Sequence, residues 1–444
     1  MTAKFIEQVA PDRLVPHERN ARTHSSKQIR MIAKSIQRFG FLNPVLVTAD
    51  NRIIAGHGRV EAAKSLGLAE VPVLRIEGLS PDEIRAYVIA DNQLALKAGW
   101  DRETLAIELQ HLGSIDFDLE VIGFETAEID LILDAEAGKA DDPGREDDVP
   151  APDAGTAVSR EGDLWLFGPA GAPRHRLLVG DARSGDVYTR LMDGVSAAMM
   201  ITDPPYNVPI AGHVSGLGRK VHREFAHASG EMSEEEFIAF LAAFMEAAGE
   251  HLVDGALSYV FMDWRHLDEL QAAGRRLGLS LVNLCVWVKT NAGMGSLYRS
   301  KHELCLIFKR GDAPHRNNVE LGKHGRSRSN VWTYAGVNTF RAGRGEDLAD
   351  HPTVKPAQMI ADAIRDVTKR GDVVLDPFAG SGTILIAAEM TGRRARAIEI
   401  DPVYADVAIR RFEAFTGKPA ILAETGETFE VVAERRMAVP VAAE

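Results

Sequence analysis

The sequence has 444 residues, with 51 Lys and Arg against 64 Asp and Glu, so its formal net charge is −13. At about 100–200 residues per domain, this length suggests two or three domains, and the composition is ordinary for a globular protein. The sequence has neither a long apolar run nor a signal-peptide core, so we expect a cytoplasmic protein without membrane spans.

Two cysteines, Cys285 and Cys305, are too few for a disulfide framework, and each lies in an apolar run, so we expect buried thiols. No Cys/His spacing suggests zinc, and we predict no metal site. The acidic balance does not exclude a nucleic-acid partner, because binding needs only a local basic face.

The N-terminal part predicts a small α+β domain over residues 1–97, followed by a helical extension over 98–138. Apolar residues recur at helical spacing from Ser26 to Phe39, and Gly40 ends that pattern. The predicted strands are 44–48, 52–55 and 71–76, and the predicted helices are 26–39, 56–66, 81–90 and segments of 101–136.

Residues 139–158 are rich in acids, Pro and Gly and predict a solvated linker. Strands and helices alternate over 159–418, which indicates an α/β sheet with helices on both faces. The predicted strands are 197–202, 257–262, 281–288, 304–308, 373–375 and 396–400, and the predicted helices are 233–249, 264–277, 356–369, 383–391 and 402–415. A tail follows over 419–444, with one predicted strand at Thr428–Ala433.

A glycine-rich turn, Asp376-Pro377-Phe378-Ala379-Gly380-Ser381-Gly382-Thr383, joins a predicted strand to a predicted helix. Gly380 and Gly382 permit positive φ and let a ligand approach the backbone. The next strand ends at Glu399, about 20 residues further on, where an acid can accept both hydroxyls of a ribose. The alternative is an ordinary strand–helix turn in which Glu399 caps the next helix.

A second loop, Asp203-Pro204-Pro205-Tyr206, follows the predicted strand 197–202. The two prolines fix φ and remove two amide donors. The Asp203 carboxylate and the Pro204 carbonyl can accept both hydrogens of an exocyclic amine and draw its nitrogen toward tetrahedral geometry, while Tyr206 stacks on the base. The alternative is a Pro-Pro turn that only ends a strand.

The glycine-rich turn resembles the S-adenosylmethionine motif of the amino-methyltransferases, and the second loop resembles the Asp-Pro-Pro-Tyr motif of the N6-adenine and N4-cytosine DNA methyltransferases. The resemblance covers roughly residues 160–416 and implies a Rossmann-like fold, S-adenosylmethionine as cofactor, double-stranded DNA as partner and base flipping. Because the catalytic loop precedes the cofactor turn, the chain resembles the permuted (beta-type) class, which often dimerises and is found in restriction–modification systems.

The first residue of the loop, Asp203, bears on which base is methylated. Cytosine N4 enzymes of this class more often carry Ser there, so Asp203 favours adenine N6. Cytosine C5 chemistry needs a cysteine beside a proline, which neither Cys provides. Cytosine N4 and RNA remain alternative targets.

The resemblance also implies roles for individual residues. His351-Pro352-Thr353-Val354-Lys355-Pro356 matches a stretch that places Thr353 and Lys355 near the methionine moiety, and Gly180-Asp181 matches a step that places Asp181 at the cofactor's adenine. The predicted catalytic residues are Asp203, Pro204, Pro205 and Tyr206. The predicted cofactor-binding residues are Asp181, Asp203, Thr353, Lys355, Asp376, Phe378, Gly380, Gly382, Thr383, Glu399 and Asp401.

Basic residues cluster between the two motifs, where we place a target-reading region at about 290–345. Residues 296–330 hold eight Lys and Arg against three acids, and a glycine-rich basic loop covers 208–230. Such segments can neutralise phosphates and present Arg to base edges; a solvated charged surface is the alternative. The predicted DNA contacts are Arg219, Lys220, Arg299, Lys301, Lys323, Arg326 and Arg328.

Residues of about 5–97 resemble the ParB-like N-terminal domain, on the basis of Val15-Pro16, Asn20-Ala21-Arg22, Asn43-Pro44-Val45 and Ile54-Ala55-Gly56-His57-Gly58-Arg59. Gly56, His57, Gly58 and Arg59 at a helix start can bind phosphate, which the resemblance extends to a nucleotide triphosphate. A turn that only packs is the alternative. Sulfiredoxin chemistry is excluded because no Cys precedes Cys285. A second hypothesis for the whole chain is a nucleotide-dependent DNA-binding module with an auxiliary methyltransferase fold.

Overall fold

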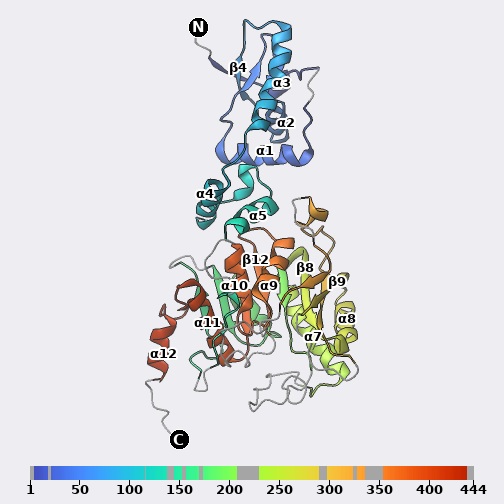
Figure 1. The fold of residues 1–444 in the computed structure, drawn as a ribbon, viewed down its shortest axis with the longest axis vertical. Coiled ribbons are helices and arrows are strands. Elements are labelled where there is room, and N and C mark those ends of the chain that lie inside the picture. Colours follow the sequence, from blue (N-terminus) through green and yellow to red (C-terminus); the bar gives the residue numbers. More distant parts are fainter. Residues whose placement is uncertain are drawn as a thin grey trace. The chain divides into compact units, whose positions relative to one another are not determined.

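The computed structural model describes residues 5–18, 22–115, 117–137, 145–152, 157–169, 174–207, 230–289, 298–323, 328–335 and 354–437. The chain divides into two compact units, Met1–Lys139 and Ala140–Glu444, and Figure 1 labels part of their helices and strands.

The first unit joins a small α+β domain to three further helical segments. Its elements are β1 (Ile6–Val9), η1 (Pro11–Arg13), α1 (Ser26–Phe39), β2 (Val45–Val47), β3 (Ile53–Ala55), α2 (His57–Ser65), β4 (Val71–Arg75), α3 (Pro81–Lys97), α4 (Arg102–Ser114), η2 (Leu119–Ile122) and α5 (Thr126–Ala137). The strand order is β1-β4-β2-β3, with β2 and β4 parallel and the other pairs antiparallel.

Helix α1 has the bounds that the sequence predicts. The Ser25 hydroxyl accepts a hydrogen bond from the Gln28 amide, which satisfies a free donor of the first turn. Gly40 ends the helix at φ +81°. The basic residues of α1 meet acids of the helical extension, since Lys27 pairs with Glu125 at 2.7 Å and Lys34 with Glu120 at 2.8 Å.

The second unit is built on one ten-stranded sheet. Its elements are η3 (Arg145–Asp147), β5 (Leu164–Phe167), β6 (His175–Val179), α6 (Gly185–Met192), β7 (Ala197–Thr202), α7 (Glu234–Gly249), β8 (Leu252–Met262), η4 (Trp264–His266), α8 (Leu267–Arg276), β9 (Ser280–Val288), β10 (His302–Lys309), η5 (Glu320–Gly322), β11 (Val331–Thr333), α9 (Ala357–Val367), β12 (Val373–Asp376), α10 (Thr383–Thr391), β13 (Arg394–Glu399), α11 (Pro402–Thr416), β14 (Ile421–Leu422) and α12 (Phe429–Met437). The strand order is β11-β9-β10-β8-β7-β12-β13-β6-β5-β14. The central strands β8, β7, β12, β13 and β6 are parallel, which confirms the predicted Rossmann-like α/β fold.

Alternate residues of the central strands face two separate layers of helices. Met199 and Val374 pack with α9, α10 and α11 on one face, and Met200 and Leu375 pack with α6, α7 and α8 on the other. This follows from the two-residue period of a strand. Both cysteines are buried, as expected, and lie opposite each other on β9 and β10.

The tail differs from the prediction. The strand predicted at Thr428–Ala433 is wrong, because these residues begin helix α12. Phe429 and Val432, which are buried, are three residues apart, whereas Val431 between them is exposed. That is helical spacing, which a β-branched pair at 431–432 masked in the sequence.

Part of the predicted linker is attached to the second unit. The Asp147 carboxylate accepts from the Ala357 amide at the start of α9 at 2.8 Å, and Arg145 donates to the Ala414 carbonyl at 2.5 Å. Within the part of the chain described, no helix is long and apolar enough to cross a membrane.

Candidate active site

Two neighbouring parallel strands at the centre of the sheet lead to helices on opposite faces. β7 and β12 lie side by side, with Met199 opposite Val374. From β7 the chain continues to α7 on one face, and from β12 it continues to α10 on the other. Loops that diverge in this way open a crevice at the carboxyl ends of the strands, where ligands of open α/β sheets bind. The sequence places Asp203–Tyr206 and Pro377–Gly382 in these two loops.

The loop after β7 is held at both ends. Pro204 is buried. At the other end, the Asn207 side chain donates to the Met232 carbonyl at 2.8 Å and accepts from the amides of Gly230 and Met232 at 3.1 Å. These bonds tie the loop to the segment that leads into α7. The carboxylate of Asp203 is therefore presented from a fixed backbone.

Asp203 is paired in this structure. The Tyr206 hydroxyl donates to one carboxylate oxygen, and the Lys355 ammonium pairs with the other. Burial raises the pKa of Asp203, Lys355 opposes that rise and the charge of Glu303 adds to it. Lys355 was predicted at the methionine moiety of the cofactor; here it lies at the catalytic loop, while Thr353 lies outside the described residues.

Two residues that the sequence analysis missed complete this cluster. Glu303 of β10 pairs with Lys355 at 3.1 Å and also with Lys289, which follows β9. Burial acts to raise the pKa of Glu303, but Lys355 and Lys289 outweigh it and bring the pKa to about 2, so Glu303 is ionised. The available signal was an acid near the start of an otherwise apolar strand, His302–Phe308.

The turn after β12 is organised around Asp376. Its carboxylate accepts from the Thr202 hydroxyl at 2.7 Å and from the Phe378 amide at 3.1 Å. Burial raises the pKa of Asp376 to about 7, against the effect of these two bonds. The Phe378 ring packs edge-on against Phe244, with 4.9 Å between centroids, so this predicted cofactor contact also belongs to the core.

Glu399 lies beside the glycine-rich turn, at the end of β13. Its carboxylate accepts from the amides of Gly380 at 2.7 Å and Asp401 at 2.9 Å. Burial raises the pKa of Glu399 to about 7, although both amides oppose the shift. An added Cβ on Gly380 would meet no atom of the described residues within 4 Å, so the turn borders open space in that part of the structure. A buried carboxylate beside open space is suited to hydroxyl donors of a ligand.

Three other predicted cofactor residues have partners within the protein. The Asp401 carboxylate caps α11 by accepting from the Val403 amide at 2.9 Å. The Thr383 hydroxyl accepts from buried Arg411 at 2.9 Å. Asp181, just beyond the end of β6, accepts from the guanidinium of Arg183 at 2.6 Å. Their cofactor roles remain predictions.

Arg411 of α11 holds the glycine-rich turn in place by hydrogen bonds. It donates to the Ser381 carbonyl at 3.2 Å, to the Thr383 hydroxyl and to the Glu146 carbonyl at 2.8 Å. The turn is thereby bonded to α11 and, through Arg411, to Glu146 in the predicted linker. Fixed backbone geometry of this kind is what close binding of a ligand requires.

Comparisons with known families agree with this arrangement. A DNA methylase model of the N6/N4 methyltransferase family matches residues 197–410, the stretch that holds both loops. A ParB N-terminal domain model matches residues 1–92, and a ParB-methyltransferase HTH domain model matches residues 103–161. Residues 197–410 are a DNA methylase domain of the N6/N4 family, and residues 1–92 are a ParB N-terminal domain.

Individual relatives resemble either part. The type II methyltransferase M2.DpnII of Streptococcus pneumoniae is 28% identical over 227 residues, which cover 49% of this chain and 83% of that protein. The ParB-like nuclease domain-containing protein YnaK of Escherichia coli (strain K12) is 47% identical over 70 residues, which cover 16% of this chain and 80% of that protein. A solved structure of PvuII DNA methyltransferase (cytosine-N4-specific) aligns with a TM-score of 0.41 and 15% identity over 59% of this chain and 91% of that one.

The predicted DNA contacts of this methyltransferase differ in their surroundings. Arg299 and Lys301 are exposed just before β10, and Lys323 pairs with Glu320 at 3.0 Å. Arg219, Lys220 and Arg326 lie outside the described residues. β10 and β11 fall within the predicted target-reading region but belong to the main sheet, so side chains that reach DNA must come from the loops beside them.

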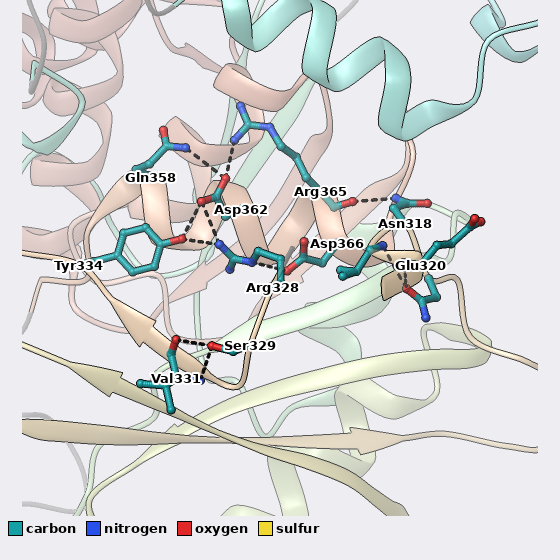
Figure 2. Close-up of polar contacts among 12 residues, drawn as sticks. Asn318, Glu320, Arg328, Ser329, Val331, Tyr334, Gln358, Asp362, Arg365 and Asp366 are labelled. Carbon is teal, nitrogen blue, oxygen red and sulfur yellow. Dashed lines mark hydrogen bonds and ion pairs between the residues drawn. The ribbon is translucent and has the colours of Figure 1, made fainter. Parts of the chain in front are cut away.

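Arg328 is held by the protein itself, as Figure 2 shows. Its guanidinium pairs with Asp362 at 3.1 Å and Asp366 at 3.2 Å and donates to the Tyr334 hydroxyl at 2.6 Å. Both acids are on α9, and the Asp362 carboxylate also accepts from Tyr334. A DNA phosphate would have to compete with two carboxylates for this guanidinium, so its geometry favours a structural role over the predicted DNA contact.

We expect Arg328→Met to reduce the free energy of unfolding by about 2–4 kcal/mol, because it removes a cation from largely buried Asp366 and leaves Asp362 with Arg365, at 3.2 Å, as a remaining cation among the described residues. Arg299→Met, at an exposed site, should change stability by less than about 0.5 kcal/mol and should weaken DNA binding with a salt slope smaller by about one. Denaturant unfolding and DNA titration at several salt concentrations measure both effects. If Arg328→Met lost DNA affinity at unchanged stability, its structural role would be refuted.

The buried acids predict how the stability of the methyltransferase unit depends on pH. The pKa of Glu399 rises from 4.5 to about 7 and that of Asp376 from 3.8 to about 7 on folding. The folded state therefore binds more protons than the unfolded chain in this window, and the free energy of unfolding falls as pH rises through it. Glu399→Gln cannot ionise, so we expect a smaller drop in melting temperature between about pH 5 and about pH 8. Thermal unfolding without ligand at several pH values measures this drop, with exposed Glu250→Gln as the control. If the melting temperature fell equally in wild type and Glu399→Gln, the raised pKa of buried Glu399 would be refuted.

The predicted phosphate site of the ParB domain lies at the start of α2. Gly56 adopts φ +104°, and an added Cβ would come within 2.9 Å of the Arg59 guanidinium. His57 Nε2 accepts from the His17 amide at 3.2 Å. Burial lowers the pKa of His57, and His17 and His24 lower it further. The Arg59 Nη2 donates to the Pro44 carbonyl at 3.4 Å, while its buried Nε has no partner among the described residues.

Proposed function

We propose that this DNA methyltransferase transfers the methyl group of S-adenosylmethionine to N6 of adenine in double-stranded DNA, with the target base flipped into the crevice between β7 and β12. The observation that carries the proposal is the position of Asp203 and Pro204 at the end of β7, beside a glycine-rich turn and a buried acid at the ends of β12 and β13.

The residues at the turn fit an adenosyl cofactor. Glu399 already accepts two backbone amides, and its carboxylate retains lone pairs for two ribose hydroxyls. Gly380 leaves the space that a bound nucleoside needs. Because hydroxyl donors favour the ionised carboxylate, we expect binding to lower the pKa of Glu399 from about 7.

The catalytic loop makes the target amine a better nucleophile. The lone pair of an exocyclic amine is delocalised into the base, so the amine is a poor nucleophile. The Asp203 carboxylate and the Pro204 carbonyl accept its two hydrogens and favour a tetrahedral nitrogen, while Tyr206 lies against the base. The cofactor, when bound, would supply a methyl group on a sulfonium, whose sulfur would leave as a neutral thioether. Most of the acceleration then comes from alignment of the amine.

Asp203 is also placed to take up the proton that the methylated amine releases. Burial raises the pKa of Asp203 and makes it a better proton acceptor than an exposed carboxylate. Lys355 and Tyr206 donate to its oxygens and hold it in one orientation.

Adenine is favoured over cytosine by Asp rather than Ser at position 203. The N6/N4 family includes enzymes for both bases, and the relative PvuII is named as cytosine-N4-specific. Cytosine N4 is therefore the second candidate target. The acidic net charge of −13 requires that DNA approach a local basic face, for which exposed Arg299 and Lys301 are candidates.

Transfer of a tritiated methyl group from S-adenosylmethionine into unmethylated plasmid DNA tests the activity. We expect label in double-stranded DNA and little in RNA of the same sequence. Label in RNA alone, or no label above an enzyme-free control, would refute the proposal.

We further propose that the ParB domain binds a nucleotide triphosphate at Gly56–Arg59. The unpartnered Arg59 Nε and the positive φ of Gly56 support a phosphate cradle at the start of α2. A nucleotide-dependent rise in melting temperature that Arg59→Ala abolishes would support it, and no rise with any triphosphate would refute it.

We also propose that the enzyme acts as a homodimer in the cytoplasm.

A further inference from the structure

Glu303 lies in the active site but belongs to neither of the two motifs. It is on β10, opposite Trp287 of β9. One carboxylate oxygen pairs with Lys289, and the other lies 3.1 Å from the Lys355 ammonium and 3.5 Å from the Tyr206 hydroxyl. Its side chain is only 16% exposed, so these contacts are largely shielded from water.

We propose that Glu303 is a positioning residue for methyl transfer: it shares the Lys355 ammonium with Asp203, so that the Asp203 carboxylate stays available to accept from the target amine. This inference rests on the proposed function, because it assigns Asp203 to that amine.

The charges of the cluster explain why a second acid is needed. Lys355 has a side chain that is 6% exposed and pairs with both Asp203 and Glu303. Its ammonium also lies 5.1 Å from the Phe261 ring centroid and 5.9 Å from that of Trp287. A buried ammonium must be paired. Without Glu303, Asp203 would be the one carboxylate paired with Lys355 among the described residues, and it would be less available to the substrate.

Lys289 anchors Glu303 from the other side. Its ammonium pairs with Glu303 and lies 4.8 Å from the Trp287 ring centroid. Two ammonium groups and two carboxylates thus alternate in the order Lys289, Glu303, Lys355, Asp203. Such alternation balances the charge and lets Asp203 form a new hydrogen bond while Lys355 keeps a partner.

The charge of Glu303 also influences the ionisation of Asp203. The titratable or charged groups that face Asp203 are Lys355 before α9, Glu303 and Cys305 on β10, Tyr206 on the same loop and Asp376 at the end of β12. Lys355 lowers the pKa of Asp203, whereas Glu303 raises it. Loss of the Glu303 charge should therefore lower the pKa of Asp203.

Glu303→Gln tests this role, since it keeps the shape of the side chain and removes its charge. We expect kcat to fall by roughly 10- to 100-fold with KM for DNA changed by less than about threefold, because the loss is in the reacting geometry. We also expect the acid limb of the kcat–pH profile to move to lower pH. Glu303→Asp, which keeps the charge, should restore the position of the acid limb, and Glu250→Gln on the exposed end of α7 is the matched control.

A second measurement needs no catalysis. A double-mutant cycle with Asp203→Asn and Lys355→Met, followed by denaturant unfolding, gives the coupling between these two residues. We expect this coupling to be larger in the Glu303→Gln background than in the wild type. Unchanged coupling, or an unchanged acid limb with a lower kcat, would overturn the positioning role. Absence of methyl transfer by the wild type would refute the proposed function alone, because the cycle still decides the role of Glu303.

Discussion

Asp203→Asn should reduce kcat for methyl transfer by roughly 100- to 1000-fold, the size of effect seen when a polar group that acts in the transition state is removed. The asparagine side chain keeps one acceptor oxygen but replaces the other with an NH2 donor, and it cannot take up the released proton. Lys355 keeps Glu303 as a partner in this variant, since the two are 3.1 Å apart. The fold and the glycine-rich turn should therefore survive the change.

The effect of Asp203→Asn on kcat should be compared with its effect on cofactor affinity. Calorimetric titration with S-adenosylmethionine tests the cofactor role predicted for Asp203 separately: because we place its carboxylate at the target amine, the Kd should stay within about threefold of wild type, less than about 1 kcal/mol, and a larger loss would assign Asp203 to the cofactor as well. Asp268→Asn, exposed in the first turn of α8, is the matched control and should match wild type in both measurements. Wild-type kcat in Asp203→Asn would remove Asp203 from the mechanism.

Gly382→Ala should abolish cofactor binding and destabilise the enzyme by about 2–5 kcal/mol. Gly382 adopts φ +78°, where an L-residue is strained, and its Cβ would lie 2.7 Å from the Ala408 Cβ and 3.1 Å from the Ala408 Cα. The contact is with the backbone of α11, which cannot move without disturbing Arg411 and the turn that it holds. Both the conformation and the packing of the turn therefore require glycine.

Gly417→Ala separates the two contributions. Gly417 has a similar φ of +69° at the end of α11, but an added Cβ would meet nothing within 4 Å. We expect Gly417→Ala to lose only about 1–2 kcal/mol of stability and to keep cofactor affinity. Denaturant unfolding and calorimetry measure both variants; equal effects of the two would show that close packing against α11 is unimportant.

The sequence predicted those elements whose pattern is local and strong. Ser26–Phe39 has a capping Ser, a helical stripe and a terminating Gly, and its bounds are confirmed. The strands at 197–202 and 373–375 are apolar because both of their faces are covered by helices, so they were recognised too. The two motifs located the crevice because they follow these neighbouring strands.

The sequence analysis missed β1, β5, β6, β11 and β14, and all of these except the five-residue central strand β6 are short strands at or next to a sheet edge. β1 and β5 have four residues each and β14 has two, and such strands depend on pairing with distant segments. Thr428–Ala433 shows the reverse error, since a pair of valines suggested a strand where the packing of Phe429 and Val432 makes a helix. A short stretch of sequence does not show which of its faces will be buried in the folded protein.

Side-chain partnerships were the least predictable part of the site. Arg328 lies in a basic segment that is typical of DNA binding, yet Asp362 and Asp366 of α9 hold it. Glu303 was assigned no chemistry because its partners, Lys289 and Lys355, are distant in sequence. Both pairings arise only when β10, β11 and α9 come together in the fold.

Mass spectrometry of nucleosides tests the central claim most directly. Unmethylated plasmid DNA would be incubated with the full chain and S-adenosylmethionine, digested to nucleosides, and compared with the product of Asp203→Asn. We predict N6-methyladenine with the wild type and at most a trace with the variant. N4-methylcytosine in place of N6-methyladenine would contradict the adenine assignment, and no methylated base of either kind would contradict the account of the active site.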